Sequence, residues 1–246
     1  MLGAVFYGCM AIGACLVFDQ VLAGQRGLSA GENIKNGAQL YDNWLKITES
    51  QTAGNHPLYP TEAAKKGKST WRCKECHGWD YMGKNGRYSK GSHYTGITGV
   101  MHVKAWKPEQ IHEALTNTGG GHDFSRYLSE DGVRSLVVFL HEGLAGIENV
   151  IDSSGRGRGD VQRGEALYDE HCAACHGPDG NMIDFKSART GVQGVRWLAE
   201  GNPQETIHKI RWGHPGSEMP SMVADAGLSE QECIDILTYS QSLAGR

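Results

Sequence analysis

Two short cysteine motifs constrain this chain more than any other feature. Residues 73–77 read CKECH and residues 172–176 read CAACH, so a histidine directly follows each pair of cysteines. The pattern C-x-x-C-H is the attachment signature of a c-type haem, in which two thiols bond to one porphyrin and the adjacent histidine lies beneath the iron. The sequence therefore predicts two haem c groups. The attachment residues are Cys73, Cys76, Cys172 and Cys175, and the proximal ligands are His77 and His176.

Other roles of a C-x-x-C pair explain less of this pattern. Such pairs also form redox dithiols, structural disulfides and halves of zinc sites. None of these roles requires a histidine after both pairs. Of the remaining cysteines, Cys9 and Cys15 lie in an apolar N-terminal run. Cys233 falls on the apolar face of a predicted helix, where we expect a buried thiol that packs as a small apolar side chain.

The N-terminus indicates export from the cytoplasm. Residues 2–18 form an apolar run without a charge, and small residues follow around Val21 and Ala23. This pattern predicts a signal peptide over residues 1–23, although no Lys or Arg precedes the run. The alternative is an uncleaved membrane anchor, for which the run is short. Both alternatives predict a periplasmic location for the rest of the chain.

Three segments of the first half of the chain recur in the second half. The pairs are NGAQLYDNW (36–44) with RGEALYDEH (163–171), KPEQIHEAL (107–115) with NPQETIHKI (202–210), and LSEDGVRSLVVFL (128–140) with LSEQECIDILTYS (228–240). The spacing differs at one place, since 31 residues separate Tyr41 from Cys73 but only three separate Tyr168 from Cys172. The first half therefore contains an insertion at about residues 43–70.

The repeated segments carry the signals of helices. The middle segments have a proline near their start, and Asn202 is a predicted N-cap. Ser229 and Glu232 have the spacing of a capping box, and apolar residues recur on one face of each final segment. We therefore expect an all-α fold, in which His112 and His208 occupy equivalent positions on a helix surface.

The second half resembles a class I cytochrome c domain. It carries GxxLYxxxCxxCHGxxG from Gly164 to Gly180, then a Met-Pro pair and a C-terminal helix. The first half resembles the family at its ends and departs from it in the insertion and the distal loop. The resemblance implies two tandem class I cytochrome c-like domains, each wrapped around one haem. They lie at residues 24–150 and 161–246, with a glycine-rich, charged linker at 151–160.

The resemblance also implies that each distal iron ligand comes from the loop before the last helix, usually as a methionine. In the second half, Met219 precedes a proline, which is the family's usual form. Other residues of the second half that contain a suitable donor are Met222, His214 and Met182. We therefore expect Met219 to be the distal ligand of the second iron.

The matching loop of the first half has no methionine, but three glycines lead directly to His122. We expect His122 to be the distal ligand of the first iron. The main alternatives are Met101 and His102, and the weaker ones are Met82, His93 and His112. Methionine ligation raises the potential of a haem iron above that of a bis-histidine iron, so the first haem is expected at the lower potential.

The resemblance implies electron transfer as the function. We expect a periplasmic dihaem cytochrome c that carries single electrons between a donor dehydrogenase or quinol oxidase and a downstream acceptor. Its partners are then redox proteins, and a formal net charge of −4 without a basic block does not suggest a nucleic acid. The alternative is a dihaem enzyme similar to thiosulfate dehydrogenases or peroxidases. The former use a cysteine as distal ligand, and residues 24–150 have no cysteine outside CKECH.

Overall fold

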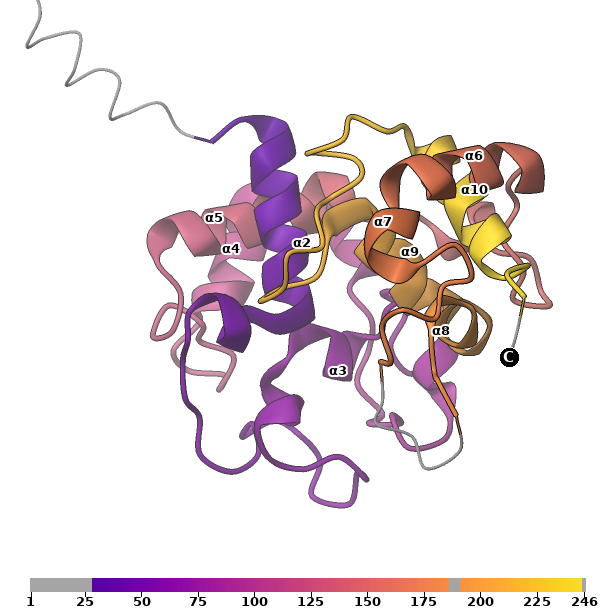
Figure 1. The fold of residues 1–246 in the computed structure, drawn as a ribbon. Coiled ribbons are helices and arrows are strands. Elements are labelled where there is room, and N and C mark those ends of the chain that lie inside the picture. Colours follow the sequence, from indigo (N-terminus) through magenta and orange to yellow (C-terminus); the bar gives the residue numbers. More distant parts are fainter. Residues whose placement is uncertain (1–27, 186–190, 245–246) are drawn as a thin grey trace, which may run out of the picture.

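A computed structural model describes residues 28–185 and 191–244 of the chain, and this part is helical (Figure 1). It contains two isolated β-bridges and no extended strand, which confirms the predicted helical fold for the described residues. The signal peptide or anchor expected over residues 1–23 lies outside them. Within the described ranges, we find no helix with both the length and the apolar character needed to cross a membrane.

The first half is organised around two helices that cross closely. Helix α2 (Ala30–Ile47) packs against α5 (Glu130–Val138), and α4 (Pro108–Thr116) also packs against α5. At the crossing, a Cβ atom on Gly37 would lie only 2.1 Å from the carbonyl oxygen of Ser135. Glycine at this position therefore lets the two helix backbones approach each other.

Short helical segments complete the first half. They are η1 (Gly67–Trp71), α3 (Cys73–His77), η2 (Arg87–Ser89), η3 (Met101–Ala105), the π-helical turn η4 (Phe139–Gly143) and η5 (Ile147–Asn149). The predicted insertion corresponds here to the end of α2, an irregular segment at residues 48–66 and η1.

The second half repeats this crossing. Its helices are α6 (Val161–His171), α7 (Ala173–His176), α8 (Val195–Gly201), α9 (Pro203–Trp212) and α10 (Glu230–Ser240). Helix α6 packs against α10, and a Cβ atom on Gly164 would lie 2.1 Å from the carbonyl oxygen of Asp235. The predicted N-cap at Asn202 and the capping box of Ser229 and Glu232 are both confirmed.

The buried apolar side chains form two clusters, one in each half. The larger cluster lies around α2, α4 and α5, and the smaller one around α6, α9 and α10. Cys233 belongs to the smaller cluster and is 0% exposed, as expected for a packed apolar thiol. In Figure 1, α2, α4 and α5 lie on one side of the molecule and α6, α7, α9 and α10 on the other.

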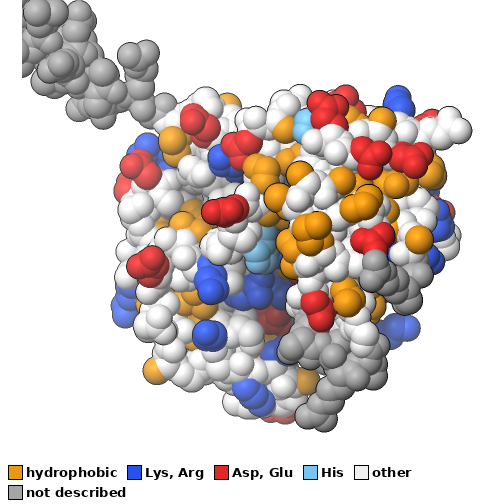
Figure 2. All heavy atoms as spheres, in the orientation of Figure 1, with side chains coloured by type: hydrophobic (Ala, Val, Ile, Leu, Met, Phe, Trp, Pro, Cys, Tyr) orange, Lys and Arg blue, Asp and Glu red, His pale blue; other side chains and the backbone are white. Residues whose placement is uncertain are grey.

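Helix α9 joins the two halves. Residues 206–212 are all buried, and Trp212 at the end of α9 belongs to the cluster of the first half. The expectation that His208 lies on a helix surface is therefore wrong, because α9 is packed on both sides. Figure 2 shows Lys and Arg side chains and one histidine near the centre of the drawn face, between the two halves.

Candidate haem sites

The first cysteine motif forms helix α3 and is held by two ring hydrogen bonds. The Tyr41 hydroxyl donates to the carbonyl oxygen of Gly78 (2.7 Å), and the Trp44 indole donates to that of Trp71 (2.7 Å). Burial raises the pKa of Cys73 and Cys76 to about 12. A redox-active dithiol needs a lowered thiol pKa, so this environment does not fit the redox-dithiol alternative.

The structure brings His77 and His122 together. Their ring centres lie 6.3 Å apart, and the ring planes make an angle of 84°. Nδ1 of His77 lies 2.8 Å from the carbonyl oxygen of Thr98, and Nδ1 of His122 lies 2.9 Å from that of Ala114. A carbonyl oxygen only accepts hydrogen bonds, so both Nδ1 atoms donate and both Nε2 lone pairs are available to a metal.

This pair fits an iron between the two rings. Two metal–nitrogen bonds of about 2.0–2.1 Å, placed in line, separate the centres of two imidazole rings by roughly 6 Å once the ring radii are added. Burial lowers the pKa of His77 to about 4, which keeps the ring neutral, as a metal ligand must be. The two rings are therefore compatible with the donor set of a bis-histidine haem, which stays a prediction.

The other candidates for the first distal ligand have different surroundings. Nδ1 of His93 lies 2.8 Å from Oε1 of Glu75, and the His112 ring lies 3.4 Å from a carboxylate oxygen of Glu130. The remaining candidates are Met82, which is 37% exposed, His102, which packs on Trp106, and Met101, which packs against the first core. His122 fits the position best, and its ligand role is a prediction that the geometry supports.

His56 is a residue of this site that the sequence did not reveal. It comes from the irregular segment after α2, is 7% exposed, and its ring centre lies 6.5 Å from that of His122. The backbone N–H of Leu58 donates to its Nδ1 (3.2 Å), so a neutral His56 carries its proton on Nε2. This tautomer is the opposite of the one that His77 and His122 adopt. The Nε2–H of His56 is therefore a hydrogen-bond donor, and neither ring nitrogen of His56 keeps a free lone pair for a metal.

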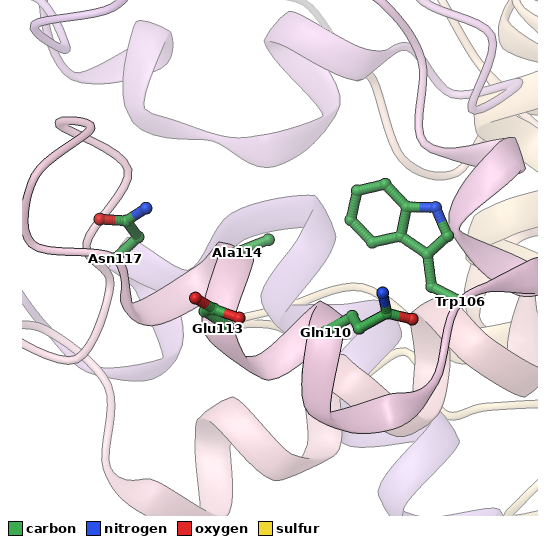
Figure 3. Close-up of a pocket in the computed structure, with 5 residues that line it drawn as sticks. All are labelled: Trp106, Gln110, Glu113, Ala114 and Asn117. Atoms are coloured by element: carbon green, nitrogen blue, oxygen red, sulfur yellow. The ribbon is translucent and has the colours of Figure 1, made fainter.

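A shallow groove lies next to the His122 loop. It has a volume of about 270 Å³, and Figure 3 shows Trp106 at one end and Asn117 at the other, with Gln110, Glu113 and Ala114 between them. A second cavity of about 570 Å³ lies between residues 86–93 and Gly201 with Asn202. Neither cavity is lined by a residue of the two cysteine motifs, so both are separate from the attachment helices.

The second motif has local geometry like that of the first. The Tyr168 hydroxyl donates to the carbonyl oxygen of Gly177 (3.0 Å), and Gly177 ends α7 with a φ of 79°, as Gly78 ends α3 with a φ of 82°. Burial raises the pKa of Cys172 to about 12 and lowers that of His176. Within the described residues, Nδ1 of His176 is buried and has no hydrogen-bond partner. The ring lies 6.0 Å from that of Phe185.

Met219 lies in the loop between α9 and α10 and is partly buried. Its carbonyl oxygen accepts a hydrogen bond from the His214 amide (3.3 Å). The other second-half candidates are Met222, which is 4% exposed in the core, Met182, which is 67% exposed, and His214, whose Nδ1 contacts the Lys209 amine. Met219 is partly buried, as His214 is, and its ligand role stays a prediction.

Residues 159–239 match the profile of a protein family described as cytochrome C oxidase, cbb3-type, subunit III. The chain is also 30% identical over 106 residues to the cbb3-type cytochrome c oxidase subunit CcoP of Rhodobacter capsulatus. That match covers 40% of this chain and 35% of the relative, so it spans about a third of the relative's length. With the attachment motifs and the helical fold, these similarities support a c-type cytochrome whose cofactor is haem c. Within that class, the similarity is to a subunit of a cbb3-type cytochrome c oxidase, which indicates an electron-transfer cytochrome.

Proposed function

We propose that this chain is a periplasmic dihaem cytochrome c built from two tandem class I cytochrome c-like domains. It carries single electrons between a donor dehydrogenase or quinol oxidase and a downstream acceptor. The similarity to an oxidase subunit favours an oxidase complex as that acceptor. When bound, each haem c supplies an iron that gains and loses one electron, and the chain's residues set the ligands, the burial and the spacing.

The observation that carries this proposal is the repetition of one structural unit around each motif. In each half, a glycine allows the first helix to cross the last one, at Gly37 and at Gly164. In each half, the tyrosine four residues after that glycine donates to the carbonyl of the residue after the proximal histidine, from Tyr41 to Gly78 and from Tyr168 to Gly177. A single haem site would not account for both copies.

The two distal loops give the protein a direction for electron flow. His122 supplies a nitrogen donor to the first iron, and Met219 supplies a thioether to the second. Methionine ligation raises the potential of a haem iron, so the second haem is the better electron acceptor. Electrons therefore pass from the first haem to the second, and the downstream acceptor docks near the second.

The test is haem counting followed by near-infrared magnetic circular dichroism and a potentiometric titration. We expect two haems per chain, one bis-histidine and one His/Met charge-transfer signal, and two separate reduction waves. One haem per chain would refute the dihaem assignment. Overlapping waves would remove the directional relay, and a high-spin signal would indicate an open iron and favour the enzyme alternative.

A further inference from the structure

His208 lies at the junction of the two halves rather than in the half that carries it in the sequence. It belongs to α9 but is only 1% exposed, and its ring lies among side chains of the first half. The ring centres of Trp79, Phe139 and Tyr41 lie 5.0, 6.0 and 6.2 Å from that of His208. A polar ring in such surroundings is costly unless both nitrogens are hydrogen-bonded.

Both nitrogens of His208 bind the first half. Nε2 lies 3.1 Å from the carbonyl oxygen of Ala38 in α2, so Nε2 carries the proton and donates it. Nδ1 then has a lone pair, which accepts a hydrogen bond from the Tyr81 hydroxyl at 2.9 Å. Burial lowers the pKa of His208 to about 4, so the neutral form needed for this arrangement is the one present at pH 7.

The hydrogen bond between Tyr81 and His208 joins two residues that are close in sequence to the two candidate haem sites. Tyr81 follows the proximal His77 by four residues, and its backbone carbonyl accepts from the amides of Val100 and Met101. His208 lies one turn before the end of α9, which leads into the loop that carries Met219. This hydrogen bond therefore links the segment that follows the first cysteine motif to α9, the helix that precedes the loop with Met219.

Two further contacts cross the same junction. The Gln39 side chain donates to the carbonyl of Trp212 (2.8 Å), and the Lys209 amine lies 3.3 Å from a carboxylate oxygen of Asp42. Interfaces between domains of one chain permit relative motion unless they are large and apolar. By contrast, a buried network in which every polar group is hydrogen-bonded holds the two parts that it joins in one arrangement.

We propose that His208 is a positioning residue for electron transfer between the two haems. By tying α9 to both Ala38 and Tyr81 of the first half, it fixes the distance and orientation between the two attachment helices. Electron tunnelling falls steeply with distance, so a junction that moves slows transfer even when each haem is intact. This inference rests on the proposed dihaem function and adds the residue that sets the coupling between its two centres.

The chain contains a matched control for this residue. His112 follows an isoleucine in α4 as His208 does in α9, but its side chain is 41% exposed and pairs with Glu130 on the surface. The substitution His208→Leu removes both hydrogen bonds and keeps a similar volume, whereas His112→Leu changes only a surface contact. Tyr81→Phe is a milder variant that removes one hydrogen bond and keeps the ring. His208→Gln restores one donor and one acceptor.

The experiment measures intramolecular electron transfer by pulse radiolysis and the iron–iron distance distribution by dipolar EPR, in the holoprotein. We expect His208→Leu to slow transfer several-fold and to broaden the distance distribution, while the spectra and potentials of both haems stay native. Tyr81→Phe has a smaller effect in the same direction, His208→Gln recovers part of the rate, and His112→Leu matches the native protein.

Two results would overturn the inference. One is a native rate with a native distance distribution in both His208→Leu and Tyr81→Phe. The other is an equal loss of rate in His112→Leu, since that would show a general effect of removing a helix histidine. If His208→Leu does not fold, Tyr81→Phe decides the question. Failure of the proposed function is recognised separately, because haem counting on the native chain would then give fewer than two haems.

Discussion

The imidazole rings of His77 and His122 lie with their centres 6.3 Å apart, although 45 positions separate the two residues in the sequence. Each ring is oriented by a backbone carbonyl, from Thr98 and from Ala114. The glycines before His122 contribute no side-chain packing to hold its loop, and Gly121 has a φ of 71°. An iron bond to His122 would therefore stabilise a loop that packing alone holds weakly.

Replacing His122 tests this assignment. We expect His122→Ala to leave one haem without its distal protein ligand, so that the bis-histidine signal disappears and a high-spin signal replaces it. The His/Met signal of the other haem stays unchanged. Near-infrared magnetic circular dichroism on the oxidised protein measures both. His102→Ala serves as the control, and loss of the bis-histidine signal in that variant alone would assign the ligand to His102.

The corresponding test for the second haem is Met219→Leu. The substitution keeps an apolar side chain of similar size but removes the sulfur, so we expect the His/Met signal to be lost and the bis-histidine signal to remain. The potential of the second haem should fall, because its distal methionine no longer favours ferrous iron. Met182→Leu is the control, since Met182 is 67% exposed. A His/Met signal that survives Met219→Leu would contradict the assignment.

Local patterns in the sequence were enough to predict the helices and the attachment residues. The capping residues at Asn202 and Ser229 depend on contacts within a few residues, and each C-x-x-C-H motif is a contiguous segment. The proximity of His122 to His77 follows from the ligand role that the resemblance to class I cytochrome c domains implies, and the repeat identified the matching loop.

His56 and His208 were beyond such reasoning. His56 lies in an irregular segment without periodicity, and its approach to His122 depends on how that segment folds over η1 and the distal loop. The apolar residues of α9 predict one face packed on the core of the second half, and His208 was expected on the opposite, solvent-facing side. The first half packs against this side of α9 and buries His208. This contact lies between the two halves, so the sequence pattern of either repeat alone does not predict it. A buried histidine needs hydrogen-bond partners for both ring nitrogens, and these partners are identified only in the tertiary structure.

The close crossing of α2 and α5 predicts that a methyl group added at Gly37 lowers the stability of the protein. In Gly37→Ala, the new Cβ would meet the Ser135 carbonyl, so α2 and α5 must separate. We expect a loss of about 1–3 kcal/mol in the free energy of unfolding, as for overpacked cores. Gly31→Ala is the control on the same helix, because nothing lies within 4 Å of a Cβ there. It should be neutral or slightly stabilising by helix propensity. Denaturant titration of both variants measures the difference, and equal effects would contradict the close crossing.

The buried carboxylate of Asp42 predicts a pH dependence of stability. Asp42 is 0% exposed and contacts both Arg72 and Lys209. Burial by itself raises the pKa of Asp42, but the charges of Lys209 and Arg72 outweigh burial and hold the pKa below its usual value. The unfolded chain then binds this proton more readily than the folded chain. The stabilisation is therefore complete above the unfolded pKa of about 3.9 and is lost as the pH falls through the folded pKa.

We expect Asp42→Asn to lower the free energy of unfolding by about 3–5 kcal/mol at pH 7, because it leaves the charge of Lys209 without its buried partner. As the pH falls below about 4 toward the folded pKa of Asp42, the native protein progressively loses this stabilisation, so the difference between native and variant should shrink there. Denaturant titrations between neutral and acidic pH measure this difference. Asp131→Asn is the control, since the Asp131 side chain is 76% exposed and pairs with Arg134, one turn further along the same helix. A difference between native and Asp42→Asn that stays constant into the acidic range would show that the carboxylate stabilises the junction by packing rather than by charge.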